Sequence, residues 1–349
     1  MNSVERAIAQ AKAEGFSLHQ DSACLVCGTP IKPNIIGHAK EHEYKNTTKI
    51  LFPVIRCEKC NLVSLFPRPD EREMDRIYPQ DYYSFNVASK HSNKNLSLVQ
   101  QIQNKLWAKR LSSQLSPILK HCFQKGPDRI LDIGCGVGVL LDIAKTVYPR
   151  AETWGIDFGE KAIEIAKQSG HKAFAGRFED INFGNSLFDV ILSRHVIEHV
   201  GRPDLFLQSC RELLSSNGVI LIETPNTNSL LFNAFKKQHS GIYHAPRHWH
   251  LFEKSTFEKL ADKLDLIIVG FGLYPVGVFW VWTLHSWFSE KFSPTLADKL
   301  FPPVKIMYGG IYSVLLMGTF QMLESFLGLF GIESSAMWIA FQKKPQAQK

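Results

Sequence analysis

The sequence predicts an α/β fold of the doubly wound type, preceded by a small cysteine-rich module. In the segment 129–145, a short apolar run passes into a glycine-rich turn and then into an amphipathic helix. In the segment 152–170, a second strand ends in the acidic residue Asp157 and is followed by another amphipathic helix. Two Cys-x-x-Cys motifs lie near the N-terminus. Strands that alternate with helices indicate a parallel sheet covered by helices.

The composition is that of a folded protein with more than one domain. The chain has 349 residues, of which 45% are hydrophobic and 21% are charged, and this length suggests two or three domains. The net charge is +7, but no block of five or more like charges concentrates it. The charge is therefore only a weak indication of a nucleic-acid or anionic-membrane partner. The first fifteen residues contain no apolar stretch, so we expect no secretory signal and a cytoplasmic location.

The two Cys-x-x-Cys motifs predict a structural zinc site. A residue that tolerates positive φ follows each motif, Gly28 after the first and Asn61 after the second, as a tight turn around a tetrahedral metal requires. Four thiolates would fill the coordination sphere and leave no position for a catalytic water. Reduced surface thiols or a redox pair are the alternatives. The expected ligands are Cys24, Cys27, Cys57 and Cys60, whereas the isolated Cys122, Cys135 and Cys210 are expected to pack.

The glycine-rich turn indicates the chemistry of its ligand. A dinucleotide-binding turn would carry its third glycine at position 139, where this chain has Val139, and Asp132 would repel a pyrophosphate. A cationic ligand is favoured instead. The Asp132 carboxylate can attract the ammonium group of S-adenosylmethionine, while Gly134 and Gly136 let the backbone approach it. Asp157 at the end of the next strand can accept both ribose hydroxyls. A bare turn between strand and helix is the alternative.

Several segments carry a family resemblance. LDIGCGVG, GIDFGEKAIEIA, FDVILSRHVIEHVGRPDLFL, NGVILIETPN and PRHWHLFEKSTFEKL resemble class I S-adenosylmethionine-dependent methyltransferases. The cysteine motifs are similar to the N-terminal module of a subgroup that includes sugar C-methyltransferases and cell-envelope glycan-cluster methyltransferases. The resemblance implies a Rossmann-like, seven-stranded methyltransferase sheet. Where relatives often have an acidic residue before the adenine contacts, this chain has Arg177. The implied cofactor contacts are Asp132, Gly134, Cys135, Gly136, Asp157, Phe158, Phe178, Glu179, Asp180, Ser193 and His195.

Histidines supply the candidates for proton transfer. His195-x-x-Glu198-His199 matches a zinc-protease motif, but the Gly-Arg-Pro that follows ends any helix after about one turn. The motif fits better in a loop at the carboxyl end of the fourth strand, where doubly wound sheets bind ligands. Methyl transfer to a weakly acidic acceptor requires a base. His199 and His248 are the candidates for this role, with His250 as a substitute, and packing against aromatic neighbours is the alternative.

The segment 275–331 lies between the last two expected strands and is unusually apolar. Pro275 to Ser289 carries three Trp, two Phe and no charge, and Ile306 to Leu323 is also uncharged. Both flanking strands belong to one sheet, so the insertion must leave and return on the same side, as a membrane-dipping hairpin or a helical lid. A helical pair buried against the sheet or in a dimer interface is the alternative. A membrane hairpin would place the protein at the inner face of the membrane and favour a lipid-linked acceptor.

We therefore expect four regions and one activity. The regions are a zinc module (1–70), a connector with covering helices (71–122) whose Tyr82 and Tyr83 reach over the site, the methyltransferase domain (123–274 and 332–345) and the apolar insertion (275–331). The activity is methyl transfer from S-adenosylmethionine to a small-molecule or lipid-linked acceptor of the sugar or polyprenyl type. An RNA methyltransferase and a non-catalytic, zinc-stapled binding protein are the alternatives.

Overall fold

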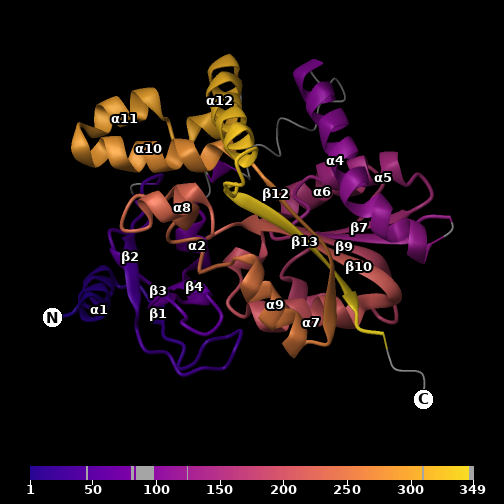
Figure 1. Cartoon of the computed structure of the whole chain (residues 1–349), viewed down its shortest axis with the longest axis horizontal. Helices are drawn as coiled ribbons and strands as arrows, with labels where there is room; N and C mark the ends of the chain where they lie inside the picture. The colour runs from indigo at the N-terminus through magenta and orange to yellow at the C-terminus, as the bar shows by residue number, and fades with distance from the viewer. Residues whose placement is uncertain (45, 80–81, 84–97, 124, 309, 346–349) are drawn as a thin grey trace.

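A computed structural model of the chain describes residues 1–349 except 45, 80–81, 84–97, 124, 309 and 346–349. Its centre is a seven-stranded sheet in the order β12-β13-β10-β9-β6-β7-β8 (Figure 1). Strand β13 is antiparallel to both β10 and β12, and the pairs from β10 to β8 are parallel. The predicted α/β fold is confirmed. The strands are β6 (Arg129–Ile133), β7 (Glu152–Asp157), β8 (Lys172–Ala175), β9 (Phe188–Arg194), β10 (Leu214–Pro225), β12 (Leu266–Tyr274) and β13 (Ala336–Lys343).

Helices cover both faces of the central sheet. Successive strand residues point to opposite faces, so Leu131 packs into the core beneath α7 and α9, while Ile130 packs into the core beneath α4 and α5. Helix α6 packs with α5 through Ile163 and Leu141. Ligands of such sheets bind where the parallel strands end, between the two helical layers. The helices are α4 (Leu98–Cys122), α5 (Val139–Val147), α6 (Glu160–Gln168), α7 (Pro203–Leu213) and α9 (Lys254–Lys263).

The N-terminal unit, residues 1–79, is joined to the rest by a shared sheet. Its second sheet has the order β11-β4-β3-β2, and β11 (His250–Leu251) comes from the loop that carries the candidate histidines. His250 pairs with Ser64 in this sheet. The N-terminal unit therefore positions that loop. Its elements are α1 (Ser3–Glu14), β1 (Leu18–His19), β2 (Ile35–Ala39), β3 (Phe52–Arg56), β4 (Val63–Leu65), β5 (Arg68–Pro69), η1 (Glu71–Glu73) and α2 (Met74–Ile77).

The apolar insertion consists of helices with different surroundings. Helix α10 (Gly277–Lys291) is largely buried, because Phe279 and Trp282 belong to the core that also contains the N-terminal unit. Helix α12 (Ile311–Gly328) is largely exposed and stands at the upper edge of the molecule in Figure 1. The first of the two apolar stretches is therefore a core helix, and an exposed hairpin of both stretches is not formed. The insertion also contains α11 (Pro294–Leu300) and η5 (Lys305–Tyr308).

Short elements complete the loops at the carboxyl ends of the strands. They are η2 (Phe178–Asp180), η3 (Ile197–His199), α8 (Leu230–Phe235) and η4 (Gly241–Tyr243).

Candidate functional site

The glycine-rich turn between β6 and α5 forms an open cradle. Its three glycines all have positive φ, which is +53° at Gly136, and a Cβ at Gly136 would meet nothing within 4 Å. The backbone N–H groups of Gly134 and Cys135 donate to the carbonyl of Ile156 at 2.8 and 2.9 Å. The turn is thus fixed to β7 on one side while Gly136 faces open space on the other. A ligand can approach the backbone there because no side chain intervenes.

The acid at the end of β7 closes the side of this cradle. Asp157 accepts hydrogen bonds from the backbone N–H groups of Gly136 and Gly159, each at 2.9 Å. The next residue, Phe158, exposes 60% of its surface, which leaves an aromatic ring free to stack on a planar ligand. Burial raises the pKa of Asp157, and its backbone hydrogen bonds oppose that rise. The predicted residues Gly136, Asp157 and Phe158 therefore lie next to one another at the turn.

Asp132 is a buried carboxylate at the end of β6. Only 2% of it is exposed. Burial raises its pKa to about 7, against the opposing charge of Arg194 and with a further rise from Asp157. On the adjacent strand β9, Ser193 Oγ is buried and has no hydrogen-bond partner among the described residues, and it lines a cavity of about 20 Å³. A buried acid and a hydroxyl without a partner among the described residues both fit a site for a polar ligand.

Two predicted cofactor contacts lie in the core instead. The Cys135 side chain is 7% exposed and packs under the turn beside Gly155, so only its backbone faces the ligand side. Phe178 is also 7% exposed, and its ring contacts Phe206 at 5.5 Å in an edge-on arrangement. Packing in the apolar core uses both side chains, so the predicted cofactor contacts of Cys135 and Phe178 are left to their backbone atoms.

The unexpected Arg177 has a partner that the local sequence does not reveal. Its guanidinium lies 2.7 Å from the carboxylate of Glu71, in η1 of the connector, and 3.8 Å from Glu179. Both Arg177 and Glu179 are about 43% exposed at the side chain. Arg177 therefore links the loop before η2 to the N-terminal part of the chain, and Glu179 remains accessible beside it.

A cluster of imidazoles surrounds the buried Glu198. Glu198 Oε1 lies 3.1 Å from His195 Nδ1, and Oε2 accepts a hydrogen bond from Thr224 at 3.0 Å. Burial alone would raise the pKa of Glu198, but the hydrogen bond to His195 and the charges of His195, His199 and His248 hold it at about 2. Glu198 is thus ionised and fully buried among histidines.

His195 has a strained backbone at the end of β9. Its φ is +52°, a conformation that costs free energy for residues other than glycine and is concentrated at functional sites. The backbone N–H donates to the carbonyl of Glu223 at 2.8 Å. On the ring, Nε2 lies 3.2 Å from the hydroxyl of Tyr274, which also lies 3.3 Å from Glu223 Oε2. His195 is therefore held in position from both sides.

His199 and His248 lie together, with ring centroids 4.7 Å apart. His199 Nδ1 is 3.1 Å from the carbonyl oxygen of Arg247, and His248 Nδ1 is 2.7 Å from that of Ile242. A carbonyl only accepts, so we assign the proton to Nδ1 in both rings and a lone pair to Nε2. Burial lowers the pKa of both histidines. Both are therefore neutral near pH 7.

His199 and His248 differ in what surrounds their Nε2 atoms. His248 Nε2 lies 3.3 Å from His244 Nδ1, which engages its lone pair. The ligand atoms of Glu198, His199 and His248 lie within 4.8 Å of one another, so the group has the size of a metal site as well as of a proton-transfer site.

Tyr78 is a site residue that the sequence did not single out. Its hydroxyl lies 2.8 Å from His199 Nδ1, whereas Tyr82 packs edge-on against Tyr78 at 5.0 Å and donates to the Tyr83 hydroxyl at 3.1 Å. Tyr78 therefore contacts His199, and the predicted Tyr82 and Tyr83 pack next to Tyr78. The signal was present, because all three belong to the same tyrosine-rich connector segment.

His250 lies in the sheet shared with the N-terminal unit and not in the imidazole cluster. Its Nδ1 is 2.9 Å from Ser64 Oγ, and burial lowers its pKa to about 4. Its place in a β-ladder indicates a structural role, so it is removed from the candidate bases.

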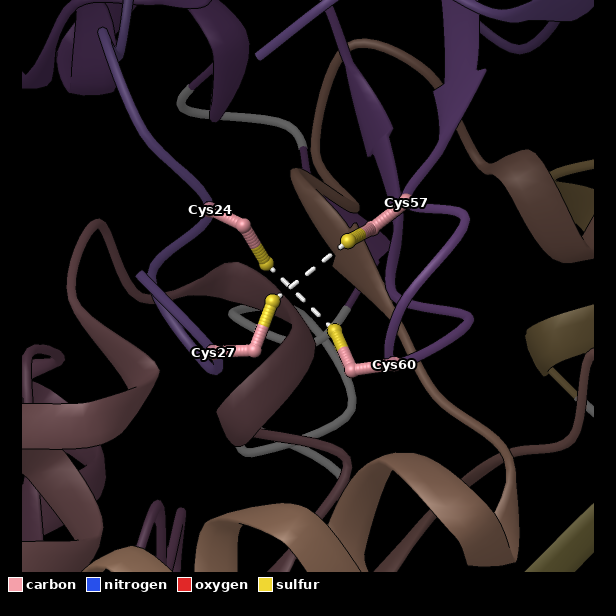
Figure 2. Close-up of side chains that lie close together, drawn as sticks. All are labelled: Cys24, Cys27, Cys57 and Cys60. Carbon is pink, nitrogen blue, oxygen red and sulfur yellow. Dashed lines mark hydrogen bonds between the residues drawn. The ribbon is translucent and has the colours of Figure 1, made fainter. Parts of the chain in front are cut away.

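Four cysteines from two loops converge at one point (Figure 2). Cys24 Sγ lies 3.4 Å from Cys60 Sγ, and Cys27 Sγ lies 3.6 Å from Cys57 Sγ, with all four sulfurs within 4.8 Å of one another. Tetrahedral zinc with Zn–S bonds of about 2.3 Å requires sulfurs about 3.8 Å apart. The donor set and the spacing therefore fit zinc.

The turns around these cysteines match the sequence expectation. Gly28 and Asn61 have φ values of +69° and +60°. Their N–H groups donate to the carbonyls of Cys24 and Cys57 at 2.8 and 2.9 Å. The predicted positive-φ positions are confirmed.

Part of the chain is similar to known methyltransferases. A family described as a methyltransferase domain matches residues 103–269. The mitochondrial ubiquinone biosynthesis O-methyltransferase of Rattus norvegicus is 29% identical over 180 residues, which cover 45% of this chain and 50% of the rat protein. The ubiquinone biosynthesis O-methyltransferase of Mesorhizobium japonicum is 36% identical over 104 residues, which cover 28% of this chain and 41% of that protein. The chain thus spans about half, or less, of the length of these relatives.

A solved structure of the plantazolicin methyltransferase BpumL in complex with SAH is also similar. It has 20% sequence identity and a TM-score of 0.43, and the match covers 79% of this chain and 91% of that chain. The residues that match the family include the glycine-rich turn. In the sheet, β13 runs antiparallel between β10 and β12. Residues 103–269 of the chain are therefore similar to a methyltransferase domain.

Proposed function

We propose that the protein transfers a methyl group from S-adenosylmethionine to a small-molecule acceptor. The observation that carries this proposal is the placement of two acids, Asp132 and Asp157, and an imidazole cluster at the carboxyl ends of adjacent strands. Asp132 lies near the end of β6, Asp157 ends β7 and accepts a hydrogen bond from Gly136, and His195 follows β9. An anionic cradle next to basic nitrogens suits a cationic donor and an acceptor that loses a proton.

The donor side of the site fits S-adenosylmethionine. When bound, this molecule supplies an electrophilic methyl group on a positively charged sulfur. Asp132 would attract the ammonium group, Asp157 would accept from the ribose hydroxyls, and Phe158 would stack on the adenine. The two backbone bonds that Asp157 accepts fix its orientation and leave lone pairs on both oxygens.

On the acceptor side, we assign the base to His199. With its Nδ1 proton held by the carbonyl of Arg247, the ring presents Nε2 as a base that can take the proton of the acceptor. The ionised Glu198 next to it would stabilise the imidazolium that forms. His248 shares this environment, but its Nε2 already faces His244. We therefore place His248 as a positioning residue behind His199.

The four cysteines are proposed to hold zinc in a structural role. Four thiolates complete a tetrahedral shell, so the ion would have no open position for a reacting group. The site also docks on the methyltransferase domain, because the carbonyl of Cys60 accepts from Thr256 of α9 at 2.8 Å and Asn61 donates to Glu253 at 2.8 Å. Zinc would therefore stabilise the contact between the N-terminal unit and α9.

The class of acceptor is supported by the relatives. Both curated relatives are named as ubiquinone biosynthesis O-methyltransferases, which favours a small molecule with a hydroxyl group. A sugar or a polyprenyl-type compound, free or lipid-linked, belongs to this class.

Calorimetric titration with S-adenosylmethionine tests the donor site. We expect the intact protein to bind and Asp157→Ala to lose about 100-fold in affinity, because two charge-assisted hydrogen bonds to the ribose disappear. The matched control is Asp262→Ala, which removes an exposed aspartate of α9 and should bind like the intact protein. If the intact, zinc-loaded protein shows no affinity, or if Asp157→Ala binds normally, the proposed function is wrong.

A further inference from the structure

Helix α12 carries the largest exposed apolar surface of the insertion. Only 11% of its 18 residues are buried, and Ile311, Leu315 and Met322 expose 82%, 64% and 68% of their surfaces. Single exposed apolar residues are ordinary, but a contiguous patch marks a binding surface. The patch extends beyond the helix and consists of Ile311, Tyr312, Val314, Leu315, Met322, Leu323, Phe326, Leu329 and Phe330.

A narrow stripe of α12 packs on α10. The ring of Phe320 stacks on Trp280 at 5.6 Å, and the backbone of Met317 lies against Gly277, where a Cβ would approach the Met317 carbonyl oxygen to 2.3 Å. Glu324 follows on the same side and accepts from Trp280 Nε1 at 2.7 Å. These positions are spaced three and four residues apart and form one side of a helix. Near its start, α12 also contacts η5, and the Tyr312 hydroxyl donates to the carbonyl of Leu300. Most of the remaining circumference is exposed in the described chain.

This uncovered surface carries no charge. Glu324 is the only Asp, Glu, Lys, Arg or His between Ile311 and Gly328, and it is 5% exposed. Besides Trp280, its carboxylate accepts from the N–H and the hydroxyl of Ser335, at 3.1 and 2.9 Å. The fold thus buries the one carboxylate that would oppose transfer of α12 into an apolar medium.

Basic residues flank the apolar patch. Lys299 and Lys305 are exposed on α11 and η5, the elements that lead to α12, whereas Lys291 at the end of α10 lies 4.0 Å from Glu290. The two acids among these elements are engaged, since Asp298 lies 2.9 Å from His285 and Glu290 lies 3.6 Å from Lys40. Exposed lysines beside an apolar helix are the pattern of an anionic lipid surface.

The strand pairing limits how the helix can meet a bilayer. The insertion leaves the sheet after Tyr274 and returns at Ala336, and these two residues are paired in the β12–β13 ladder. A helix of 18 residues is about 27 Å long, but both ends of the insertion are fixed to the same end of one sheet. A single crossing is therefore incompatible with this fold, and interfacial docking is compatible with it.

The patch is one helix away from the candidate site. Phe279 of α10 contacts the ring of His195, with centroids 6.2 Å apart, while the neighbouring Trp280 stacks on Phe320 of α12. Helix α10 thus touches the imidazole cluster on one side and α12 on the other. We propose that α12 and its flanking lysines dock the protein on an anionic bilayer, from which an amphiphilic, membrane-partitioned acceptor reaches the site. The acceptor part of this proposal rests on the proposed function.

Vesicle flotation of the full-length protein tests the docking. We expect the protein to float with vesicles of phosphatidylcholine and phosphatidylglycerol and more weakly with phosphatidylcholine alone. The triple variant Leu315→Ser, Met322→Ser, Leu329→Ser should lose at least about tenfold in vesicle partition, since each side chain loses apolar burial in the bilayer. The matched control carries Leu51→Ser, Leu187→Ser and Leu205→Ser, three exposed leucines elsewhere, and should float like the intact protein.

Two further measurements separate the outcomes. The pair Lys299→Gln, Lys305→Gln should reduce the preference for anionic vesicles and leave the weak binding to phosphatidylcholine unchanged. Affinity for S-adenosylmethionine, measured on the same samples, should be equal in all variants. The docking proposal is overturned if the intact protein floats with neither vesicle, or if the triple variant floats normally. It is also overturned if the protein is instead a dimer that the triple variant dissociates, because a second copy then covers α12. If the intact protein does not bind S-adenosylmethionine, the proposed function is wrong, whatever the vesicle experiment shows.

Discussion

The guanidinium of Arg247 donates a hydrogen bond to the carboxylate of Glu41 at 2.7 Å, and both side chains are almost completely buried. The same guanidinium lies over the rings of Tyr44 and Tyr82, at 4.9 and 5.3 Å from their centroids. Arg247 also supplies the carbonyl that holds His199. The N-terminal unit therefore fixes the loop that carries the proposed acceptor side.

Replacing Glu41 by Gln should destabilise the protein by about 3 kcal/mol, because the buried guanidinium of Arg247 loses the carboxylate that it is hydrogen-bonded to and keeps only the more distant Glu43 as a counter-charge. Urea unfolding measures this difference. The matched control is Glu258→Gln, which breaks the exposed pair of Glu258 with Lys254 at 3.2 Å and should change the stability by less than about 0.5 kcal/mol. Equal stabilities of the two variants would mean that the Arg247–Glu41 pair does not hold the loop.

Loss of zinc should affect the whole chain and not only its first residues. The intact protein is expected to contain one equivalent of zinc, measured by elemental analysis, and Cys57→Ser should lose it. Because Lys263 and Thr256 of α9 donate to the carbonyls of Leu25 and Cys60, the variant should also melt at least about 5 °C lower.

Cys210→Ala is the matched control for the zinc prediction. It removes a cysteine that is buried beside the sheet, apart from the four-cysteine group, so its zinc content should be unchanged. Intact protein without metal, or zinc retained by Cys57→Ser, would contradict a four-cysteine site.

The parts that the sequence predicted correctly depend on local patterns. Positive φ at Gly28 and Asn61 follows from the two-residue spacing of each cysteine motif, and the turn at Gly136 follows from its neighbouring glycines. In the same way, the acid Asp157 is the last residue of a strand that the sequence predicts. Each of these features is determined within a few residues of the chain.

The features of the site that the sequence did not predict depend on partners far away in the chain. Arg177 departs from the family pattern because it pairs with Glu71, and Tyr78 enters the site through His199. Phe178 was expected at the cofactor, but a ring contact with Phe206 places it in the core. The stretches 275–289 and 306–323 have similar compositions, and only the contacts of α10 with the N-terminal unit distinguish a core helix from an exposed one.

Affinity for S-adenosylmethionine should rise with pH below neutrality. Burial raises the pKa of Asp132 to about 7, so below that pH the side chain is protonated and cannot attract the ammonium group. Between about pH 5 and pH 7, affinity should increase by up to about tenfold per pH unit. Calorimetry over this range measures the slope. Asp132→Asn should bind weakly with a flatter profile, and a profile as steep as that of the intact protein would assign the titration to another group.

His199 is expected to set the pH dependence of methyl transfer. Burial lowers its pKa below the ordinary value of about 6.5, so the ring is already neutral at pH 7. The rate with saturating donor should therefore be constant above neutrality and should fall on the acid side of the lowered pKa, as the base becomes protonated. His199→Asn should reduce kcat by about 10² to 10⁴ and remove this acid limb, with donor affinity unchanged.

Glu198→Gln and His248→Asn separate this role from structural support. Without the carboxylate of Glu198, the imidazolium of His199 loses its stabilising charge. In Glu198→Gln, the acid limb should therefore move to lower pH, and kcat should fall. His248 contacts His199 through its ring and is not the proposed base, so His248→Asn should reduce kcat less than His199→Asn and keep the acid limb. If instead His248→Asn abolishes the limb and His199→Asn preserves it, the base is His248, and the hydrogen bond between His248 and His244 must open before the acceptor proton can be taken.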